Sequence, residues 1–149
     1  MLQDAVEVLL RNGVGAVQME CPEFSLYGNP RPPRSKDGYD TPEFRQRCRG
    51  IAEHACDLMD RYLAKGSDFE VTIVAVVGVE NSPSCGVSRA PRTVEGETVS
   101  RPGRGHLMDA LEAEMRRRVI DVPMIGVSLN PKEREDCLRR LEALCSEGV

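Results

Sequence analysis

Apolar residues recur at helical spacing in four stretches of the chain. They fall three or four positions apart in residues 2–11, 41–65, 106–119 and 132–146, and this spacing places them along one face of a helix. Asn12 with Gly13 is typical of a helix end, while Thr41 followed by Pro42 is typical of a helix start. The pattern therefore predicts four amphipathic helices, each with one face against a core.

Three apolar stretches between these helices predict strands. They are residues 14–19, 70–79 and 122–129, and the middle one is a continuous β-branched run, as is typical of a strand covered on both faces. Strands that alternate with helices favour a parallel sheet with right-handed crossovers. We predict a single domain over residues 1–149 with a three-layer α/β/α, Rossmann-like fold and a small, mostly parallel sheet. Because such domains usually open with a strand, the opening helix indicates that an amino-terminal strand is missing.

Two long polar segments follow the first two predicted strands. Residues 20–40 and 89–105 are rich in Pro, Gly and Arg, and long loops inside a compact domain are often functional. In parallel sheets the working residues lie beyond the carboxyl ends of the strands. Cys21 follows the first predicted strand and Cys85 follows the second. We therefore expect the two cysteines to meet at one edge of the sheet.

Composition and charge narrow the function classes. The chain is 40% hydrophobic and 30% charged and has no tryptophan, which fits a globular domain with an aliphatic core. Its net charge of −4 argues against a nucleic-acid partner, because phosphate binding needs a basic face. The apolar run of residues 71–79 is too short to cross a bilayer, and the residues after Met1 do not read as a signal peptide. We expect a cytoplasmic protein that binds neither membranes nor nucleic acids.

The six cysteines divide into two groups. No pair has C-x-x-C spacing, which disfavours a zinc ribbon or a thioredoxin-type site. Four cysteines lie on apolar helical faces and are expected to be core residues, namely Cys48, Cys56, Cys137 and Cys145. Cys21 and Cys85 lie instead on turns beside proline and polar residues. In such a place a cysteine serves as a ligand or nucleophile, or fills a tight turn as a small residue.

The histidines give little support for a cysteine nucleophile, which needs a histidine base. His54 lies in the middle of a predicted helix and is expected at the surface. His106 lies at a helix start, where it either points into the site or has a capping or solvated role. Soft metal chemistry fits the two thiols better, because thiolates select iron-sulfur clusters, zinc or copper(I).

Two motifs resemble those of the thiouracil desulfidase family. "CPE" (residues 21–23) follows a strand and precedes the Gly and Pro-Arg segment of residues 28–31, and "SPSCG" (residues 82–86) follows a later strand. Either motif alone is weak, whereas both together on an α/β pattern are specific. The resemblance covers about residues 9–105, and "YDTPEFRQRC" (residues 39–48) is similar to archaeal-type members.

The resemblance implies an iron-sulfur desulfidase with an oxygen-sensitive [4Fe-4S] cluster. Three cysteines hold the cluster in this family, and the open iron takes sulfur from a small thiolated compound in a non-redox reaction. The matching ligands here are Cys21 and Cys85, and the matching residues for proton transfer or support are Glu23, Ser82 and Ser84. The arginines of the two basic loops would then lie near the pocket and bind an anionic substrate group, or they would serve only surface solubility. These arginines are Arg31, Arg34, Arg89 and Arg92.

The chain departs from this family at its start. Family members usually begin with a strand that ends in the first cluster cysteine, and this chain has no cysteine before Cys21. Recruitment of Cys48 or Cys56 instead conflicts with their place on a helical face. Three explanations stay open: a truncated chain, an inactive variant without a cluster, and a subunit completed by another chain. A sheet edge left exposed by the missing strand also favours a homodimer.

Two other function classes are compatible with the sequence. The first is a non-enzymatic α/β module that binds a small ligand or a partner through the two loops. The second is a phosphate or nucleotide binder, because Gly103-Arg104-Gly105 precedes a helix start, although the full glycine-rich fingerprint is absent. Iron and labile sulfide content separates the desulfidase from the binding module.

Overall fold

The computed structural model describes residues 2–66 and 68–148 and confirms the four predicted helices. These are α1 (Gln3–Arg11), α3 (Pro42–Leu63), α4 (His106–Arg117) and α5 (Pro131–Glu147). At the start of α3 the backbone amide of Phe44 donates to Thr41 Oγ1 at 3.1 Å, so the predicted cap forms. Gly13 follows α1 with a φ of +66°, the left-handed conformation that favours glycine.

One sheet consists of two parallel strands, β1 (Val76–Val79) and β4 (Met124–Val127). Val76 lies opposite Met124 and Val79 opposite Val127. Both strands are shorter than the sequence predicted. The predicted strand over residues 14–19 is wrong as a strand, since this segment is extended but pairs with no strand of the described ranges. An apolar sequence alone does not make a strand, because a strand also needs a neighbour for its backbone groups.

The second sheet is a hairpin where the sequence predicted a polar loop. It joins β2 (Arg89–Val94) to antiparallel β3 (Glu97–Pro102). Glu95 and Gly96 form its turn with φ values of +51° and +81°, as two-residue hairpin turns require. The Thr and Val residues on both sides of Glu95-Gly96 were a hairpin signal that the arginines and glycines of this stretch obscured.

The predicted loop over residues 20–40 also contains regular structure. It holds the short helix α2 (Pro22–Tyr27) and the 3-10 turn η1 (Asp37–Tyr39). Pro22 starts α2 because proline suits the first helical position. The fold is thus mixed α/β, and the parallel sheet within the described ranges is smaller than the predicted Rossmann-like sheet.

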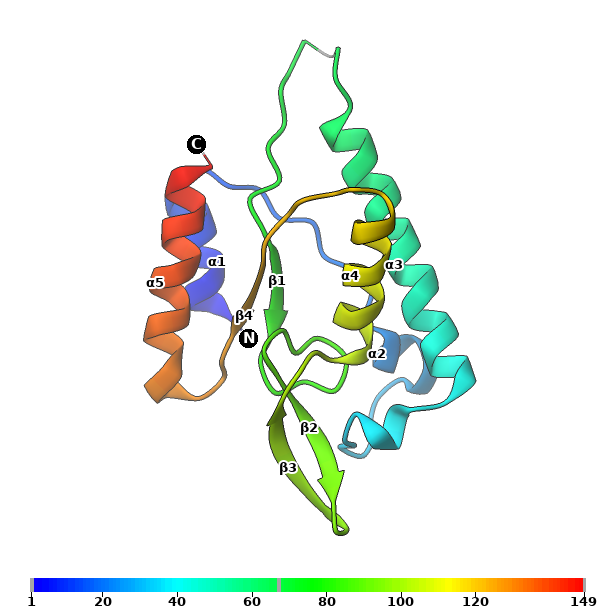
Figure 1. Cartoon of the computed structure of the whole chain (residues 1–149). Coiled ribbons are helices and arrows are strands. Elements are labelled where there is room, and N and C mark those ends of the chain that lie inside the picture. The colour runs from blue at the N-terminus through cyan, green and yellow to red at the C-terminus, as the bar shows by residue number, and fades with distance from the viewer. Residues whose placement is uncertain (1, 67, 149) are drawn as a thin grey trace.

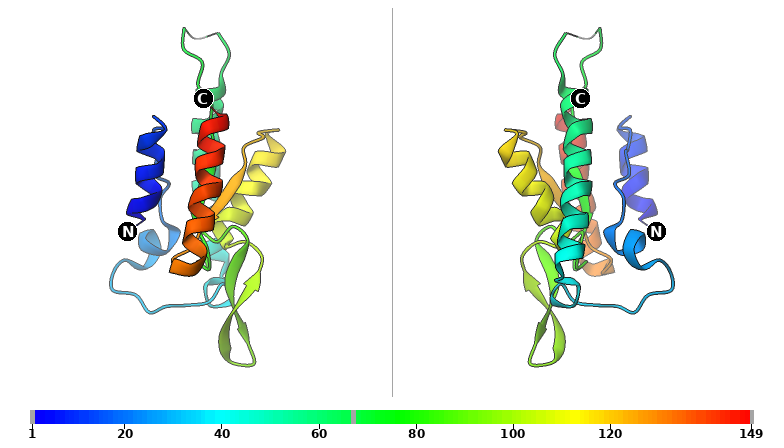
Figure 2. Two further views of the ribbon diagram at one scale, coloured as in Figure 1. Left: turned by 90° about the vertical axis from the view of Figure 1, so that its left-hand side faces the viewer. Right: turned by 90° about the vertical axis from the view of Figure 1, so that its right-hand side faces the viewer.

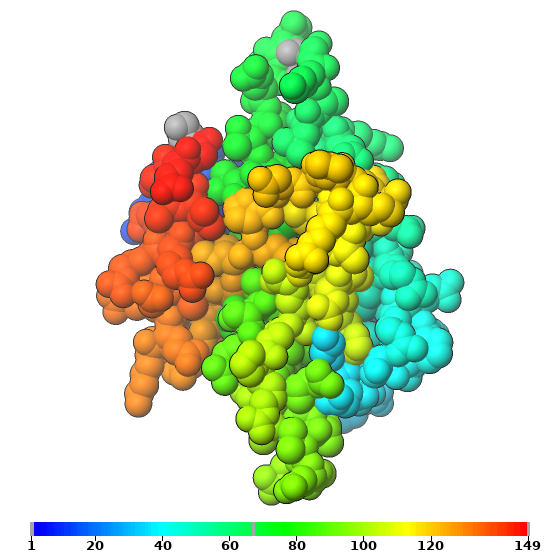
Figure 3. All heavy atoms as spheres, in the orientation of Figure 1, coloured from blue at the N-terminus to red at the C-terminus, as the bar shows by residue number. Residues whose placement is uncertain are grey.

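Helices lie on both sides of the parallel strands (Figure 1). Helices α1 and α5 lie on one side of β1 and β4, and α3 and α4 lie on the other. The side views show that the extended segment after α1 runs on the same side of the molecule as α1, away from α4 (Figure 2). The β2–β3 hairpin and the loop between α3 and β1 project from opposite ends of the molecule (Figure 3).

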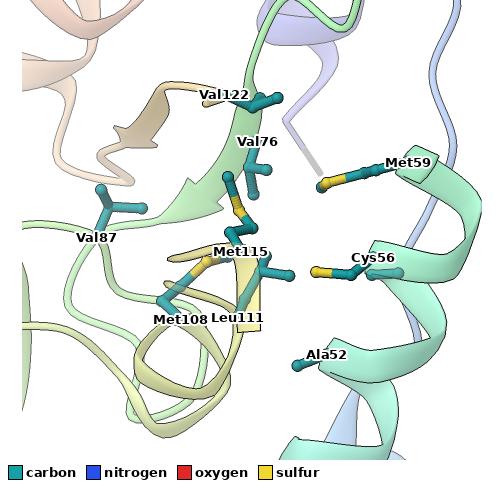
Figure 4. Close-up of a cluster of buried hydrophobic side chains, with 10 residues drawn as sticks. Ala52, Cys56, Met59, Val76, Val87, Met108, Leu111, Met115 and Val122 are labelled. Atoms are coloured by element: carbon teal, nitrogen blue, oxygen red, sulfur yellow. The ribbon is translucent and has the colours of Figure 1, made fainter. Parts of the chain in front are cut away.

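Two clusters of buried residues in the described ranges are aliphatic and sulfur-rich, as predicted, whereas a third contains the aromatic residues Tyr39 and Phe44. Figure 4 shows Cys56 and Met59 of α3 directed toward Leu111 of α4 and Val76 of β1. On the other side of the strands, α1, α5 and β4 form a second cluster. The four cysteines predicted to be core residues are confirmed as buried: Cys48, Cys56, Cys137 and Cys145. Within the described ranges, no helix has both the length and the apolar character to cross a membrane.

Candidate functional site

The loop with Cys85 is held by backbone contacts to the start of α4. The amides of His106 and Leu107 donate to the carbonyl oxygens of Pro83 and Ser84, at 2.9 and 3.0 Å. These first helical amides have no partner inside their own helix, so the loop satisfies them. The same contacts occupy the helix end that a phosphate would need, which weakens the phosphate-binding hypothesis for residues 103–105.

Ser82 fixes the turn that carries Cys85. Its side-chain Oγ accepts a hydrogen bond from the amide of Cys85 at 3.0 Å, and its carbonyl oxygen accepts one from the amide of Gly86 at 3.1 Å. The Ser82 hydroxyl also lies 3.4 Å from Ser84 Oγ. Ser82 therefore orders the loop, and Ser84 extends from it toward α2.

The two predicted motifs meet through a serine and a carboxylate. Ser84 Oγ donates a hydrogen bond of 2.7 Å to Glu23 Oε1. Ser84 is 1% exposed and the Glu23 side chain is 12% exposed. Glu23 lies in the first turn of α2, two residues after Cys21, which occupies the N-cap position of that helix. The expectation that the loops after two predicted strands meet is confirmed for residues 21–23 and 82–86.

The Cys85 thiol is half-buried and favours its protonated form. Burial raises the pKa of Cys85, the hydrogen bond with Ser84 lowers it in part, and the nearby Cys21 and Glu23 raise it again. Ser84 Oγ lies 3.6 Å from the Cys85 sulfur. Burial is the main cause that raises the pKa of Cys48 on α3 to about 12. The nearby Cys85 and Glu23 raise this pKa as well. A metal that binds Cys85 must therefore displace a proton.

The thiols do not complete a ligand set for a cluster. In residues 2–66 and 68–148, no three His, Cys, Asp or Glu side chains are grouped so that they hold a metal ion. A [4Fe-4S] cluster that needs three thiolates from one chain thus does not fit the residues present.

A pocket of about 640 Å³ adjoins the Glu23–Ser84 pair. Its lining includes Glu23, Arg31, Arg34, Tyr39, Asn81 and Pro83. Pockets that combine apolar walls with a few convergent polar groups are typical of small-molecule sites. A second hollow of about 540 Å³ beside α2 and α3 contains none of the residues predicted for the site.

The predicted arginines have different surroundings. Arg31 Nε donates to Glu23 Oε2 at 3.3 Å. The guanidinium carbon of Arg34 lies 5.1 Å from the centre of the Tyr27 ring, within the range of a cation–π contact. Arg89 Nε donates to Ser100 Oγ at 3.0 Å, and Arg92 forms an ion pair with Asp37. Arg31 and Arg34 line the pocket, whereas Arg89 and Arg92 lie on the hairpin.

Neither histidine is placed to act as a base on the thiols. The Nε2 atom of His106 lies 2.8 Å from the carbonyl oxygen of Lys36, and its ring packs edge-on against Phe44. His106 therefore links α4 to η1. His54 is exposed on α3, as expected.

Sequence reasoning missed Tyr39 as a residue of the site. Its side chain is buried beneath the pocket, and its hydroxyl lies 3.5 Å from Glu23 Oε2. Burial raises the pKa of Tyr39, and the charge of Glu23 raises it further. An aromatic residue inside a polar loop, just before the cap of a long helix, was the available signal.

This α/β fold, with a Cys, Glu and Ser site between two loops, has a counterpart among known families. The model of the family described as "Putative 2-thiouracil desulfurase" matches residues 8–101. The chain belongs to this family. The match spans both motifs and confirms the resemblance drawn from them.

The chain is also similar to an archaeal protein. The chain is 27% identical over 141 residues to "Uncharacterized protein MJ0003" of Methanocaldococcus jannaschii, which covers 95% of this chain and 79% of the relative. This archaeal relative carries no assigned activity in its name. No solved structure matches the chain.

Proposed function

We propose that the chain removes sulfur from a small thiolated compound, with 2-thiouracil as the first candidate. The observation that supports this most strongly is the 2.7 Å hydrogen bond between Ser84 and Glu23. It joins the two cysteine-bearing motifs beside the pocket. Membership of a family named for 2-thiouracil desulfuration adds to this support.

The proposed reaction is a hydrolysis with no change of oxidation state. The oxygen of water bonds to the thiocarbonyl carbon, the carbon–sulfur bond breaks, and sulfur leaves as hydrogen sulfide. Glu23 accepts one proton from the attacking water and passes it to the departing sulfur. The second proton leaves the new hydroxyl as the carbonyl forms and joins the sulfur, so that hydrogen sulfide is released. Ser84 holds Glu23 Oε1 in place, and Ser82 holds the loop.

The proposal assigns the substrate's sulfur to the side of Cys21 and Cys85. The Cys85 thiol lies near enough to Cys21 and Glu23 for both to raise its pKa, and sulfur is a soft atom that suits soft neighbours. Cys21 and Cys85 are also the two ligands that this chain would offer to a [4Fe-4S] cluster, the cofactor that the resemblance implies. Such a cluster would supply an electrophilic iron for the departing sulfur, and it needs a ligand beyond the described set.

The proposal assigns an anionic substituent of the substrate to the basic side of the pocket. Of the four arginines that the sequence predicts for this role (Arg31, Arg34, Arg89 and Arg92), Arg31 and Arg34 line the pocket. Arg34 suits it best, because its guanidinium stacks on aromatic rings at the pocket wall. No carboxylate in the described ranges forms an ion pair with Arg34, so its charge is available to a ligand.

Sulfide release and metal content test this proposal together. The protein is reconstituted anaerobically with iron and sulfide and then desalted, and bound iron, acid-labile sulfide and sulfide released from 2-thiouracil are measured. We expect Glu23→Gln to lower the rate of sulfide release by about 10²- to 10⁴-fold. Ser146→Ala, on the exposed face of α5, is the matched control.

The possible results of this assay lead to different conclusions. Iron that is bound by the wild type and lost in Cys85→Ser would show that a cluster assembles with a further ligand. Sulfide release without bound iron would remove the cluster from the proposal and keep the hydrolysis. Absence of sulfide release from every preparation would overturn the proposed function and favour a binding module.

A further inference from the structure

The two carboxylate oxygens of Glu23 have different partners. Oε1 accepts the hydrogen bond from Ser84. Oε2 faces the other way, toward Arg31 Nε at 3.3 Å and the Tyr39 hydroxyl at 3.5 Å. A carboxylate that is held on both oxygens has one orientation, so these contacts decide where Oε1 points.

Arg31 is itself held by the segment that follows α2. One terminal nitrogen of its guanidinium donates to Asn29 Oδ1 at 2.6 Å and to the carbonyl oxygen of Gly28 at 3.3 Å. The Arg31 side chain is 25% exposed. Its donors are therefore directed to oxygens of this protein, and a planar guanidinium fixed at several points is a rigid support for a carboxylate.

Arg34, three residues later, differs in this respect. Its guanidinium lies over the rings of Tyr27 and Tyr39, at 5.1 and 5.5 Å from their centres. These contacts leave its hydrogen-bond donors directed away from the rings. Two arginines that the sequence treats alike thus have separate surroundings at the same pocket.

We propose that Arg31 is a positioning residue that acts through Glu23, and that Arg34 is the arginine that contacts the substrate. The inference rests on the proposed desulfuration, because Glu23 is the base of that reaction. Arg31 holds Glu23 Oε2 through its Nε atom, and the Tyr39 hydroxyl lies next to the same oxygen. With Oε1 held by Ser84, the whole carboxylate then has one orientation at the wall of the pocket, where the reacting water binds.

Steady-state kinetics of sulfide release from 2-thiouracil and from a thiolated nucleoside monophosphate test the two roles. We expect Arg31→Gln to lower kcat about 10²-fold, the size of effect that a misplaced group produces, and to leave KM within about twofold of the wild type. Arg31→Lys should recover part of the loss, because a lysine retains the charge but not the fork of donors. Arg34→Gln should instead raise KM for the monophosphate and leave KM for the free base unchanged.

A double-mutant cycle shows whether Arg31 acts through Glu23. If it does, Arg31→Gln in the Glu23→Gln background lowers kcat no further than Glu23→Gln alone. A further decrease of kcat in that background would overturn the inference. So would an increase of KM like the one expected for Arg34→Gln. Either result would show that Arg31 contacts the substrate itself.

Thermal unfolding keeps the inference testable without turnover. If the wild type releases no sulfide, the proposed function fails. The melting temperatures of Arg31→Gln, Glu23→Gln and the double variant then decide whether Arg31 is the partner of Glu23. Losses that are smaller in the double variant than the sum of the single losses would support Arg31 as the partner of Glu23. Additive losses would overturn that partnership, whatever the function of the protein.

Discussion

Glycines decide how closely the Cys85 loop approaches its neighbours. A β-carbon on Gly105 would lie 2.4 Å from the carbonyl carbon of Ser84 and 2.5 Å from its oxygen. A β-carbon on Gly86 would lie 2.2 Å from the carbonyl oxygen of Arg89. Both neighbours are backbone atoms that cannot turn aside, so the loop keeps its place only beside glycine.

A substitution at Gly105 tests this close approach. We expect Gly105→Ala to lower the free energy of unfolding by about 1–3 kcal/mol, because the added carbon forces the Ser84 backbone away from α4. Sulfide release should fall as well, since Ser84 moves relative to Glu23. Denaturant unfolding monitored by circular dichroism measures the change.

The control for this prediction is Gly15→Ala. A β-carbon on Gly15 meets nothing within 4 Å, so this variant should match the wild type in stability to within about 0.5 kcal/mol. Equal stabilities for the two variants would contradict the argument from close contact.

At the scale of elements, the β2–β3 hairpin is fastened to η1 on one side of the pocket. Asp37 accepts hydrogen bonds from Arg92 at 2.7 and 2.9 Å and from the backbone amide of Thr93 at 2.7 Å. The amide of Lys36 donates to the carbonyl oxygen of Pro91 at 2.7 Å. Ser35 Oγ and Thr93 Oγ1 also lie 2.6 Å apart. The hairpin and the segment with Arg31 and Arg34 are therefore held together by the Asp37 carboxylate, a backbone bond and a pair of hydroxyl groups.

Asp37 makes this connection dependent on pH. The hydrogen bond from Arg92, with that from the amide of Thr93, holds the pKa of Asp37 well below its usual range. A carboxyl whose pKa is lower in the folded state stabilises the fold above its unfolded pKa, about 3.9 for Asp, and loses that contribution as the pH falls below it. We expect Asp37→Asn to melt about 1–4 °C below the wild type at pH 7.

The pH dependence of this difference is the measurement that checks the sign. The gap in melting temperature between the wild type and Asp37→Asn should narrow as the pH is lowered from 7 to about 3. Asp136→Asn is the control, because Asp136 forms its ion pair with the exposed Arg139 within the same helix, α5. A gap that stays constant or widens toward low pH would contradict this account of Asp37.

At the scale of the whole molecule, neither outer edge of the two-stranded parallel sheet pairs with a further strand in the described ranges, and the outer edge of β1 is the one considered for a partner. The amide of Glu80 donates to Val127 of β4 at 3.0 Å, and that of Val76 donates to Pro123, directly before β4, at 2.8 Å. On the other side of β1, the amide of Val79 donates to the carbonyl oxygen of Cys85 at 3.1 Å, and the earlier residues of β1 direct alternate backbone groups to the same side. Apolar side chains of α1 and the following segment are exposed nearby on the same side of the molecule, with Val6, Leu10 and Val17 at 49%, 71% and 63%. Unpaired edges beside exposed apolar surface tend to find partners.

We predict that the protein forms a homodimer through this side. Size-exclusion chromatography with light scattering should give a mass near twice that of the chain at concentrations of tens of micromolar. Val17→Lys should shift the equilibrium toward the monomer, because a charge is placed in the apolar contact. Val119→Lys, at an exposed position after α4, should not. A monomer at all concentrations would contradict the prediction.

The sequence by itself determined the helices and the meeting of the two motifs. Thr41 and Asn130 cap their helices through their own side chains, and Gly13 ends α1, so these boundaries depend on local chemistry. The meeting of "CPE" and "SPSCG" was expected because both follow apolar stretches, although only the stretch before "SPSCG" forms a strand. Family membership was also carried by these motifs.

Only the tertiary structure decided the rest. Residues 14–19 and 122–129 have similar apolar patterns, but only the second stretch forms a strand, because pairing depends on a neighbour that is distant in sequence. Arg31 and Arg34 are equally basic in the sequence, and their different partners follow from the path of the chain after α2. Tyr39 contacts Glu23 only because α3 and α4 bring η1 beneath the pocket. Local chemistry sets where helices begin and end, whereas contacts between distant residues set which strands pair and which charges meet.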